Sequence, residues 1–202
     1  MGLRERKRER TRAEILEVAR ALFLSDGYDE TTMEHIAEVA EVGPSTLYRY
    51  FPTKDELVLA PIIATVGRLA GLLAERPAAE DLDTALGNAL RGYLEEFDSR
   101  AQEINELRDI LDKTARPRAQ LWEVWNQDMA TLNDAIAARA GADPAEPWVS
   151  ITAHATKLVA SMAIDRARDD PRPSTSVDTA ESILAVLRSS VVLPRLSGAA
   201  TG

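Results

Sequence analysis

Residues 42–57, VGPSTLYRYFPTKDEL, gather side chains that are suited to contact with a polyanion. Pro44 fits the first turn of a helix because it has no N–H to leave unpaired. The pattern therefore predicts a short helix over residues 44–51. Helical geometry places Leu47 and Phe51 on one face, where they can pack inward. The side chains turned outward or to the flanks are Ser45, Thr46, Tyr48 and Arg49.

Each outward side chain suits a particular contact with duplex DNA. Ser45 and Thr46 stand at the N-terminal end of the short helix, where they can reach base edges or thymine methyl groups. Arg49 can bind guanine through two hydrogen bonds, or a phosphate. Tyr48 and Tyr50 offer phenolic donors to phosphate oxygens on either side of a groove. Taken singly, each tyrosine is equally typical of a half-buried packing residue.

Further anion contacts are expected at two helix starts and in the N-terminal arm. Lys54 lies in the first turn of the next predicted helix, where free N–H groups already favour an anion, so it is a candidate phosphate clamp. Thr31 or Thr32 can act similarly at the preceding helix. Residues 1–12 carry six basic and two acidic residues, although the formal charge of the chain is −9. This arm, Arg4–Arg10, is either a phosphate or minor-groove contact or a solvated charge run.

Three Thr-x-x-Glu patterns, TRAE at 11–14, TTME at 31–34 and TKDE at 53–56, predict helix starts through capping boxes. The first helix would end at Gly27 and the second near Ala40. Two short helices joined by a tight turn form a helix-turn-helix. Its second helix suits the DNA major groove, which admits one α-helix and displays base edges.

The rest of the chain predicts longer helices separated by loops that contain Pro and Gly, and no segment shows a convincing strand pattern. The expected fold class is all-α. The expected helices lie near 54–75, 81–98, 101–114, 117–140, 147–168 and 177–192.

One face of the predicted helix over 117–140 is aromatic and apolar. Its residues, together with apolar residues of preceding helices, are candidates for lining a cavity for a small apolar ligand, although each alone is typical of ordinary core. The set is Tyr93, Phe97, Ile110, Trp122, Trp125, Asn126 and Met129.

The last two predicted helices carry apolar stripes that indicate an interface. The first stripe contains Ile151, Ala155, Leu158, Val159 and Met162. The second contains Ile183, Leu184, Leu187 and Val191. In a monomer both stripes would point inward, and in a dimer they would pack as a four-helix bundle.

Composition excludes several classes of function. The chain has no Cys, which removes disulfides, thiolate nucleophiles and cysteine-ligated metals. The two His are far apart and neither belongs to a metal-binding pattern, so we expect no metal and no cofactor. We see no signal peptide and no apolar run of membrane-spanning length, which predicts a cytoplasmic protein without a membrane partner.

The stretch TTMEHIAEVAEVGPSTLYRYFPTKDEL resembles the DNA-binding domain of the TetR-like family of bacterial regulators. The resemblance covers about the first quarter of the chain. Residues 194–202 are small and polar, which predicts a disordered tail. The resemblance implies a nine-helix protein with a three-helix head at 1–53 and a ligand-binding and dimerisation body at 54–193. It also implies that Pro44 faces bases together with Ser45 and Thr46. Where the family has Gly in the turn, this chain has Glu41.

The resemblance implies a homodimeric, ligand-responsive repressor that binds a palindromic double-stranded DNA operator and is released by a small-molecule effector. There are two alternatives to the repressor function. An all-α enzyme would need a nucleophile with a base or a phosphate-binding loop, and neither pattern is present, so we expect no enzyme. A helical adaptor would use the apolar stripes to bind another protein without touching DNA.

Overall fold

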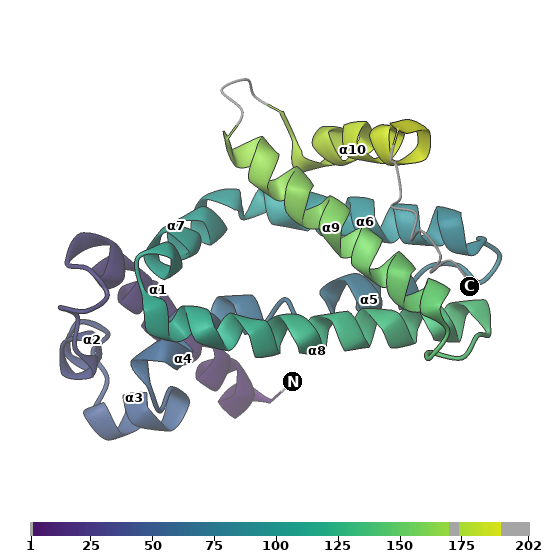
Figure 1. Ribbon diagram of the computed structural model, residues 1–202. Coiled ribbons are helices and arrows are strands. Elements are labelled where there is room, and N and C mark those ends of the chain that lie inside the picture. Colours follow the sequence, from purple (N-terminus) through teal and green to yellow (C-terminus); the bar gives the residue numbers. More distant parts are fainter. Residues whose placement is uncertain (1, 170–173, 191–202) are drawn as a thin grey trace, which may run out of the picture.

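The computed structural model describes residues 2–169 and 174–190, with the backbone alone for 115–119. Within these residues every regular element is an α-helix, so the all-α prediction is confirmed. The elements are α1 (Leu3–Ser25), α2 (Met33–Val39), α3 (Pro44–Tyr50), α4 (Lys54–Ile63), α5 (Arg68–Ala74), α6 (Leu82–Ser99), α7 (Ala101–Asp112), α8 (Ala115–Ala140), α9 (Pro147–Asp169) and α10 (Ser176–Ser190). Helices α1–α4 gather at one end of the molecule and α5–α10 form the remainder (Figure 1).

The head is built on a core that reaches beyond its own three helices. Ile15, Phe23, Ile36 and Leu47 from α1–α3 are buried together. The same cluster takes in residues of α4 and three residues of α7, which are Leu107, Ile110 and Leu111. Helix α7 therefore holds the head against the body.

The expected single helix over 54–75 is two helices, which is why residues 2–169 and 174–190 form ten helices where about nine were expected. Pro61 lies inside α4 and supplies no N–H for the carbonyl one turn earlier. The chain then leaves the helix at Ala64 and re-enters at Gly67, whose φ of 74° is left-handed. Glycine adopts this conformation without steric cost. The break separates a head-packing helix from a body-packing helix.

The segment Lys54–Ala74 also corrects an expectation about membrane spans. By length and composition, and with a mean hydropathy of 2.0, it is long and apolar enough to cross a membrane. Its apolar residues are used inside the protein, because Leu57, Val58, Leu59 and Ala60 lie in the head core, while α5 packs in the body core. The hydropathy of this segment reflects its contact with both cores.

The body packs α5, α6, α8, α9 and α10 around one apolar cluster that includes Leu73, Leu94, Leu132 and Ile136. Helix α10 packs against α9 and crosses it at an angle (Figure 1). Arg139 of α8 fixes the loop between α5 and α6, because its guanidinium donates to the carbonyl oxygens of Leu73, Arg76, Pro77 and Glu80 at 2.7–3.4 Å.

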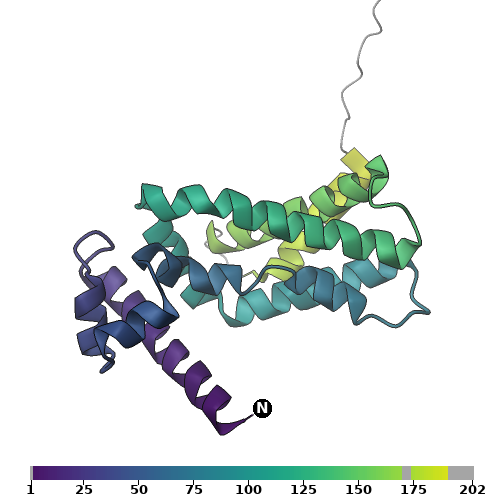
Figure 2. The same ribbon diagram turned by 90° about the horizontal axis from the view of Figure 1, so that it is seen from below.

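Two of the three predicted helix starts need correction. Thr53 caps α4 as expected and accepts a hydrogen bond from the backbone N–H of Glu56 at 3.2 Å. Helix α2 is capped by Thr32, which accepts from the N–H of His35 at 3.1 Å, and not by Thr31. Thr11 caps nothing, because α1 already begins at Leu3. The N-terminal half of α1 extends as a lone helix beyond the head (Figure 2).

Candidate nucleic-acid interface and effector cavity

The turn between α2 and α3 contains a strained residue. Glu41 has φ 53° and is the non-glycine residue with positive φ among the described residues. The N–H of Val42 donates to the carbonyl of Ala37 at 3.0 Å, which closes the end of α2 in a Schellman-type arrangement. At the position where the family has glycine, this chain therefore has a glutamate in the left-handed conformation, at a cost of about 1 kcal/mol.

Helix α3 is oriented by two buried side chains. Leu47 is 0% exposed and Phe51, just after the helix, is 2% exposed. With that face held in the head core, Ser45 and Arg49 are fully on the surface and Thr46 is half-buried. Pro44 is exposed at the N-terminal end of the helix. The polar face predicted from the sequence is thus available to a partner.

The two tyrosines of α3 differ in environment. Tyr48 is 42% exposed and its hydroxyl donates to Glu34 Oε1 at 3.0 Å. This hydrogen bond to a carboxylate holds the pKa of Tyr48 above its ordinary value, so the phenol keeps its proton near neutral pH. Tyr50 is half-buried and packs against the head core, with the Arg49 guanidinium 5.8 Å from its ring centroid. Tyr50 therefore combines a packing role with a partly exposed ring.

Thr31 does not fit the predicted anion contact. Its side chain is 1% exposed, and its hydroxyl donates to the carbonyl of Gly27 at 2.8 Å. The residue joins the end of α1 to the start of α2. Thr32, next to it, is exposed at the N-terminus of α2 and stays a candidate for a phosphate contact.

Lys54 is used inside the head. Its ammonium donates to the carbonyl oxygens of Tyr28 at 2.6 Å, Asp29 at 3.3 Å and Thr31 at 2.9 Å. It also lies 4.4 Å from the centroid of the Tyr28 ring. Because an ammonium has three donors, this arrangement leaves none for a phosphate. We therefore replace the expected phosphate clamp by a structural role, in which Lys54 ties the start of α4 to the α1–α2 loop.

The charges around α3 have both signs. The basic residues of the N-terminal arm are exposed on the first turns of α1, where Arg10 pairs with Glu14 at 2.8 Å. Acidic residues also belong to the helix-turn-helix, since Glu38 at the end of α2 and Glu41 in the turn are exposed. A polyanion would therefore meet local attraction from the arm and from Arg49, and repulsion at the turn.

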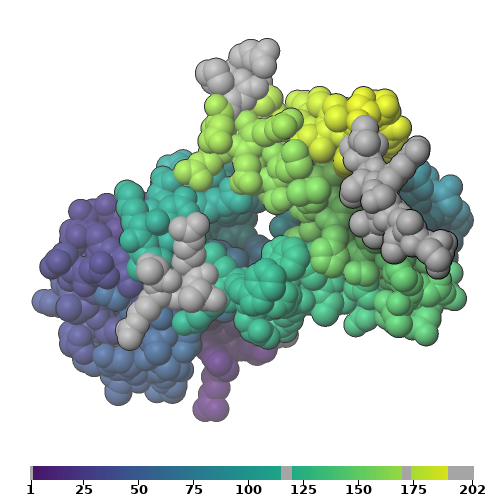
Figure 3. All heavy atoms as spheres, in the orientation of Figure 1, coloured from purple at the N-terminus to yellow at the C-terminus, as the bar shows by residue number. Residues whose placement is uncertain are grey.

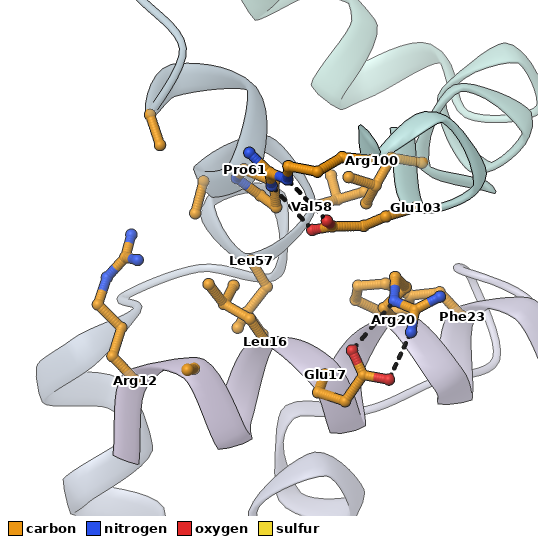
Figure 4. A pocket seen from close by; sticks show the side chains of 14 residues that line it. Arg12, Leu16, Glu17, Arg20, Phe23, Leu57, Val58, Pro61, Arg100 and Glu103 are labelled. Atoms are coloured by element: carbon orange, nitrogen blue, oxygen red, sulfur yellow. Dashed lines mark hydrogen bonds and ion pairs between the residues drawn. The ribbon is translucent and has the colours of Figure 1, made fainter. Parts of the chain in front are cut away.

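A cavity of about 310 Å³ lies where the head meets the body, between α1, α4 and α7. Figure 4 shows Arg12, Arg20 and Arg100 around it. Arg20 of α1 forms ion pairs with Glu17 and with Glu106 of α7. The pair with Glu106 is a direct polar link between head and body.

A second cavity, of about 330 Å³, lies in the body and is enclosed by α4, α6, α7, α8 and α9. Figure 3 shows the molecule hollowed between α7, α8 and α9. The lining is mostly apolar and includes aromatic rings of Tyr93, Phe97 and Trp125. The size and the apolar character are those of a small-molecule site. Pro61 and Leu107 line both this cavity and the junction cavity.

Some of the seven predicted ligand contacts line the body cavity and the others do not. Three of them, Tyr93, Phe97 and Trp125, line the body cavity. Ile110 is buried in the head core, and Met129 is buried in the body core. Trp122 is 67% exposed and stacks on Trp125 with 5.6 Å between the centroids. Asn126 is half-buried and does not line the cavity.

The charged residues of the cavity lining were not predicted from the sequence. Asp128 and Lys157 form an ion pair of 2.5 Å there, and each side chain is 13% exposed. Asp128 also accepts a hydrogen bond from the N–H of Gly67 at 2.7 Å. The pair joins residues 29 positions apart in the sequence on two helices, so no local spacing could have identified it.

The predicted interface stripes are only partly exposed. On α9, Ile151 is 68% and Leu158 51% exposed, and Ala155 lies on the same exposed face. Val159 of α9 and Ile183 of α10 are buried in the body core, so they cannot contact a partner directly. Met162, Leu184 and Leu187 are half-buried against that core. Val191 lies outside the described residues.

The histidines are engaged locally, and neither belongs to a metal centre. His35 lies 3.9 Å from Glu38 on the exposed side of α2. The Nδ1 of His154 is 2.7 Å from the carbonyl oxygen of Ser150, and its ring meets the edge of Trp125. Across residues 2–169 and 174–190 no group of three His, Asp or Glu is placed to hold a metal ion.

Two short helices, a tight turn and an outward polar second helix define a helix-turn-helix protein. Residues 15–60 match the family model "Bacterial regulatory proteins, tetR family". The resemblance to TetR-like regulators is thus confirmed, and the head of this chain is a TetR-family helix-turn-helix domain.

Curated relatives match only part of the chain. The chain is 44% identical over 93 residues to the HTH-type transcriptional regulator TcmR of Streptomyces glaucescens, which covers 46% of this chain and 41% of the relative. It is 34% identical over 104 residues to TtgR of Pseudomonas putida, which covers 49% of each. The chain thus matches less than half of the length of these curated relatives.

Solved structures match the fold over most of the chain. NalD, the secondary repressor of the MexAB-OprM multidrug efflux pump in Pseudomonas aeruginosa, has a TM-score of 0.63 at 20% identity and covers 91% of this chain and 96% of its own. FadR of Bacillus subtilis, in complex with stearoyl-CoA, has a TM-score of 0.63 at 15% identity, with 89% and 99% coverage. At these identities the likeness establishes the fold alone.

Replacing Glu41 by Gly should stabilise the protein, because Gly relieves the left-handed strain at φ 53°. We expect a gain of up to about 1 kcal/mol, which corresponds to a rise in Tm of about 2–4 °C for a chain of this size. Glu38→Gly is the matched control, since Glu38 is helical and its replacement should lower Tm by a similar amount. A fall in Tm for Glu41→Gly, measured by thermal circular dichroism, would contradict the strain at this turn.

Replacing Lys54 by Met should lower Tm, because three carbonyl oxygens of the α1–α2 loop lose their donor. The expected loss is roughly 1–3 kcal/mol. Lys7→Met makes the same chemical change on the exposed first turns of α1 and should leave Tm unchanged. If both variants have the same Tm as the wild type, Lys54 has no structural role and its ammonium is free for another partner.

Proposed function

We propose that this chain is a homodimeric, ligand-responsive transcriptional regulator of the TetR family, acting as a repressor in the cytoplasm. The observation that carries the proposal is the exposed polar face of α3 within a domain that matches the tetR family model. A helix presented in this way fits the major groove. The curated relatives that match about half of the chain are transcriptional regulators by name.

The contacts to DNA divide into two kinds in this proposal. Pro44, Ser45 and Thr46 face the base edges at the N-terminal end of α3, and Arg49 reads a base or a phosphate. Tyr48, Tyr50 and Thr32 hold phosphates on either side of the groove. Thr31 and Lys54 support these residues from inside the head without touching DNA.

Dimerisation through α9 supplies the second head. The exposed stripe on α9, Ile151, Ala155 and Leu158, has the length and the spacing to pack on its symmetry mate. Met162, Leu184 and Leu187 are half-buried against the body core, so each keeps some exposed surface for this contact. A C2 dimer places its two α3 helices on one face of a duplex when they are spaced about one helical turn, ~34–36 Å, apart, which matches a palindromic operator.

The effector is a small, largely apolar molecule held in the body cavity. Tyr93, Phe97 and Trp125 supply aromatic walls, and Pro61 belongs to α4, the helix that enters the head core. Release follows if the ligand prefers the conformation in which the heads are wrongly spaced for adjacent grooves. Our proposal includes no enzymatic activity.

A gel-shift experiment with DNA from upstream of its own gene, repeated across salt concentrations, tests the proposal. The regulator predicts a retarded band that weakens steeply with salt, whereas a helical adaptor gives no band. Thr46→Ala and Arg49→Ala should change which operator variants bind, while Tyr48→Phe should weaken all of them similarly.

The same titration tests the role given to Lys54. Removing a phosphate contact lowers the slope of log affinity against log salt by about 0.9. We expect that change for Lys7→Met and not for Lys54→Met. Equal loss of selectivity from the replacements of Thr46, Arg49 and Tyr48 would contradict the division between base and phosphate contacts.

A further inference from the structure

The lining of the body cavity includes three charged residues. Asp128 and Lys157 pair there at 2.5 Å, and the Lys157 ammonium lies 5.1 Å from the centroid of the Tyr93 ring. The remaining charged residue of the lining is Arg108, whose guanidinium pairs with Asp165 at 2.8 Å. Two cations and one carboxylate therefore line this cavity, in a chain whose net charge is −9.

The Asp128–Lys157 pair is suited to exchange. Both side chains are withdrawn from water, so the desolvation cost offsets much of their attraction. An anionic group of a ligand would keep the buried ammonium paired when the carboxylate leaves it. An ammonium has three donors, and the pair with Asp128 uses one of them. The aromatic walls formed by Tyr93, Phe97 and Trp125 would hold the apolar part of such an anion.

We propose that the effector of this chain is an aromatic, largely apolar molecule that carries one acidic group, and that this group pairs with Lys157 in exchange for Asp128. The inference deepens the proposed function and rests on it, because the ligand is an effector only if the chain is a ligand-responsive regulator. The acidic group is identified by the chemistry of Lys157, and the aromatic body by the walls of the cavity.

The exchange has a consequence at the break between α4 and α5. Asp128 holds the N–H of Gly67 at 2.7 Å through the carboxylate oxygen that Lys157 does not contact. Gly67 begins α5 directly after the residues that leave α4, and α4 carries four residues of the head core. A carboxylate released from Lys157 gains freedom to move, which loosens the Gly67 contact and the anchor of α4.

A matched pair of fluorescent probes tests the ligand class. 1-Anilinonaphthalene-8-sulfonate and N-phenyl-1-naphthylamine share one aromatic body and differ by the sulfonate alone. We expect the wild type to bind the sulfonate roughly tenfold more tightly than the neutral probe. One charge-assisted contact is sufficient for a difference of this size. Lys157→Met should remove that preference. Lys113→Met, which makes the same change outside the cavity lining, should retain it.

Asp128→Asn provides a second variant that keeps an acceptor for Gly67. It removes the competing charge, so the sulfonate should bind several-fold more tightly while the neutral probe is unaffected. Equal affinity of the wild type for both probes, or a preference that survives Lys157→Met, overturns the assignment of an acidic ligand. An Asp128→Asn variant with unchanged sulfonate affinity overturns the exchange.

Hydrogen exchange of the peptide over residues 62–70 tests the coupling. The sulfonate should speed exchange of this peptide, and the neutral probe should not. Unchanged exchange on sulfonate binding overturns the link between Asp128 and Gly67. None of these measurements uses DNA, so a chain that binds the probes as expected and binds no operator contradicts the proposed function alone.

Discussion

The burial of Leu47 and Phe51 decides what α3 presents to its surroundings. A seven-residue helix can pack only one face, and these two side chains commit that face to the head core. The opposite face then contains Ser45 and Arg49, with Tyr48 at its flank. No feature of the polar residues themselves fixes this orientation. The apolar residues, which contact no DNA in our account, determine whether the polar ones can.

Polar contacts inside the head also stabilise it. Lys54 gathers three backbone carbonyls from the loop before α2, and Thr31 bonds back to the end of α1. Helix α4 extends this support into the body, since it packs in the head core and lines the body cavity through Pro61 and Ile62. One short helix therefore contacts both the head core and the body cavity. Arg20 and Glu106 add a direct ion pair between the same two parts.

The sequence was sufficient for features whose cause is local. The helix-turn-helix, the cap at Thr53 and the outward residues of α3 follow from spacing within a few turns of chain. It was insufficient where different structures share one local pattern. Thr31 and Thr32 both precede a helix, and only the packing of the α1–α2 loop buries the first. The basic arm has the composition of a solvated run, yet it forms the first turns of α1.

Features that depend on long-range contacts could not be predicted from local patterns for the same reason. Val159 and Leu158 are neighbours in an apolar stripe, but the position of α10 buries one and leaves the other exposed. The aromatic candidates at Trp122 and Trp125 lie one turn apart, and only Trp125 points into the cavity. The Asp128–Lys157 pair depends on how α8 and α9 cross.

The chain has no cysteine, which allows the central claim to be tested by placing a single thiol on α3. Ser45→Cys puts it on the exposed face, and Ser182→Cys puts an equivalent thiol on the exposed side of α10. The measurement is the rate of maleimide labelling with and without an operator duplex. Our account predicts that the duplex protects position 45 and leaves position 182 reactive. Equal labelling of position 45 in free and DNA-bound protein would contradict it.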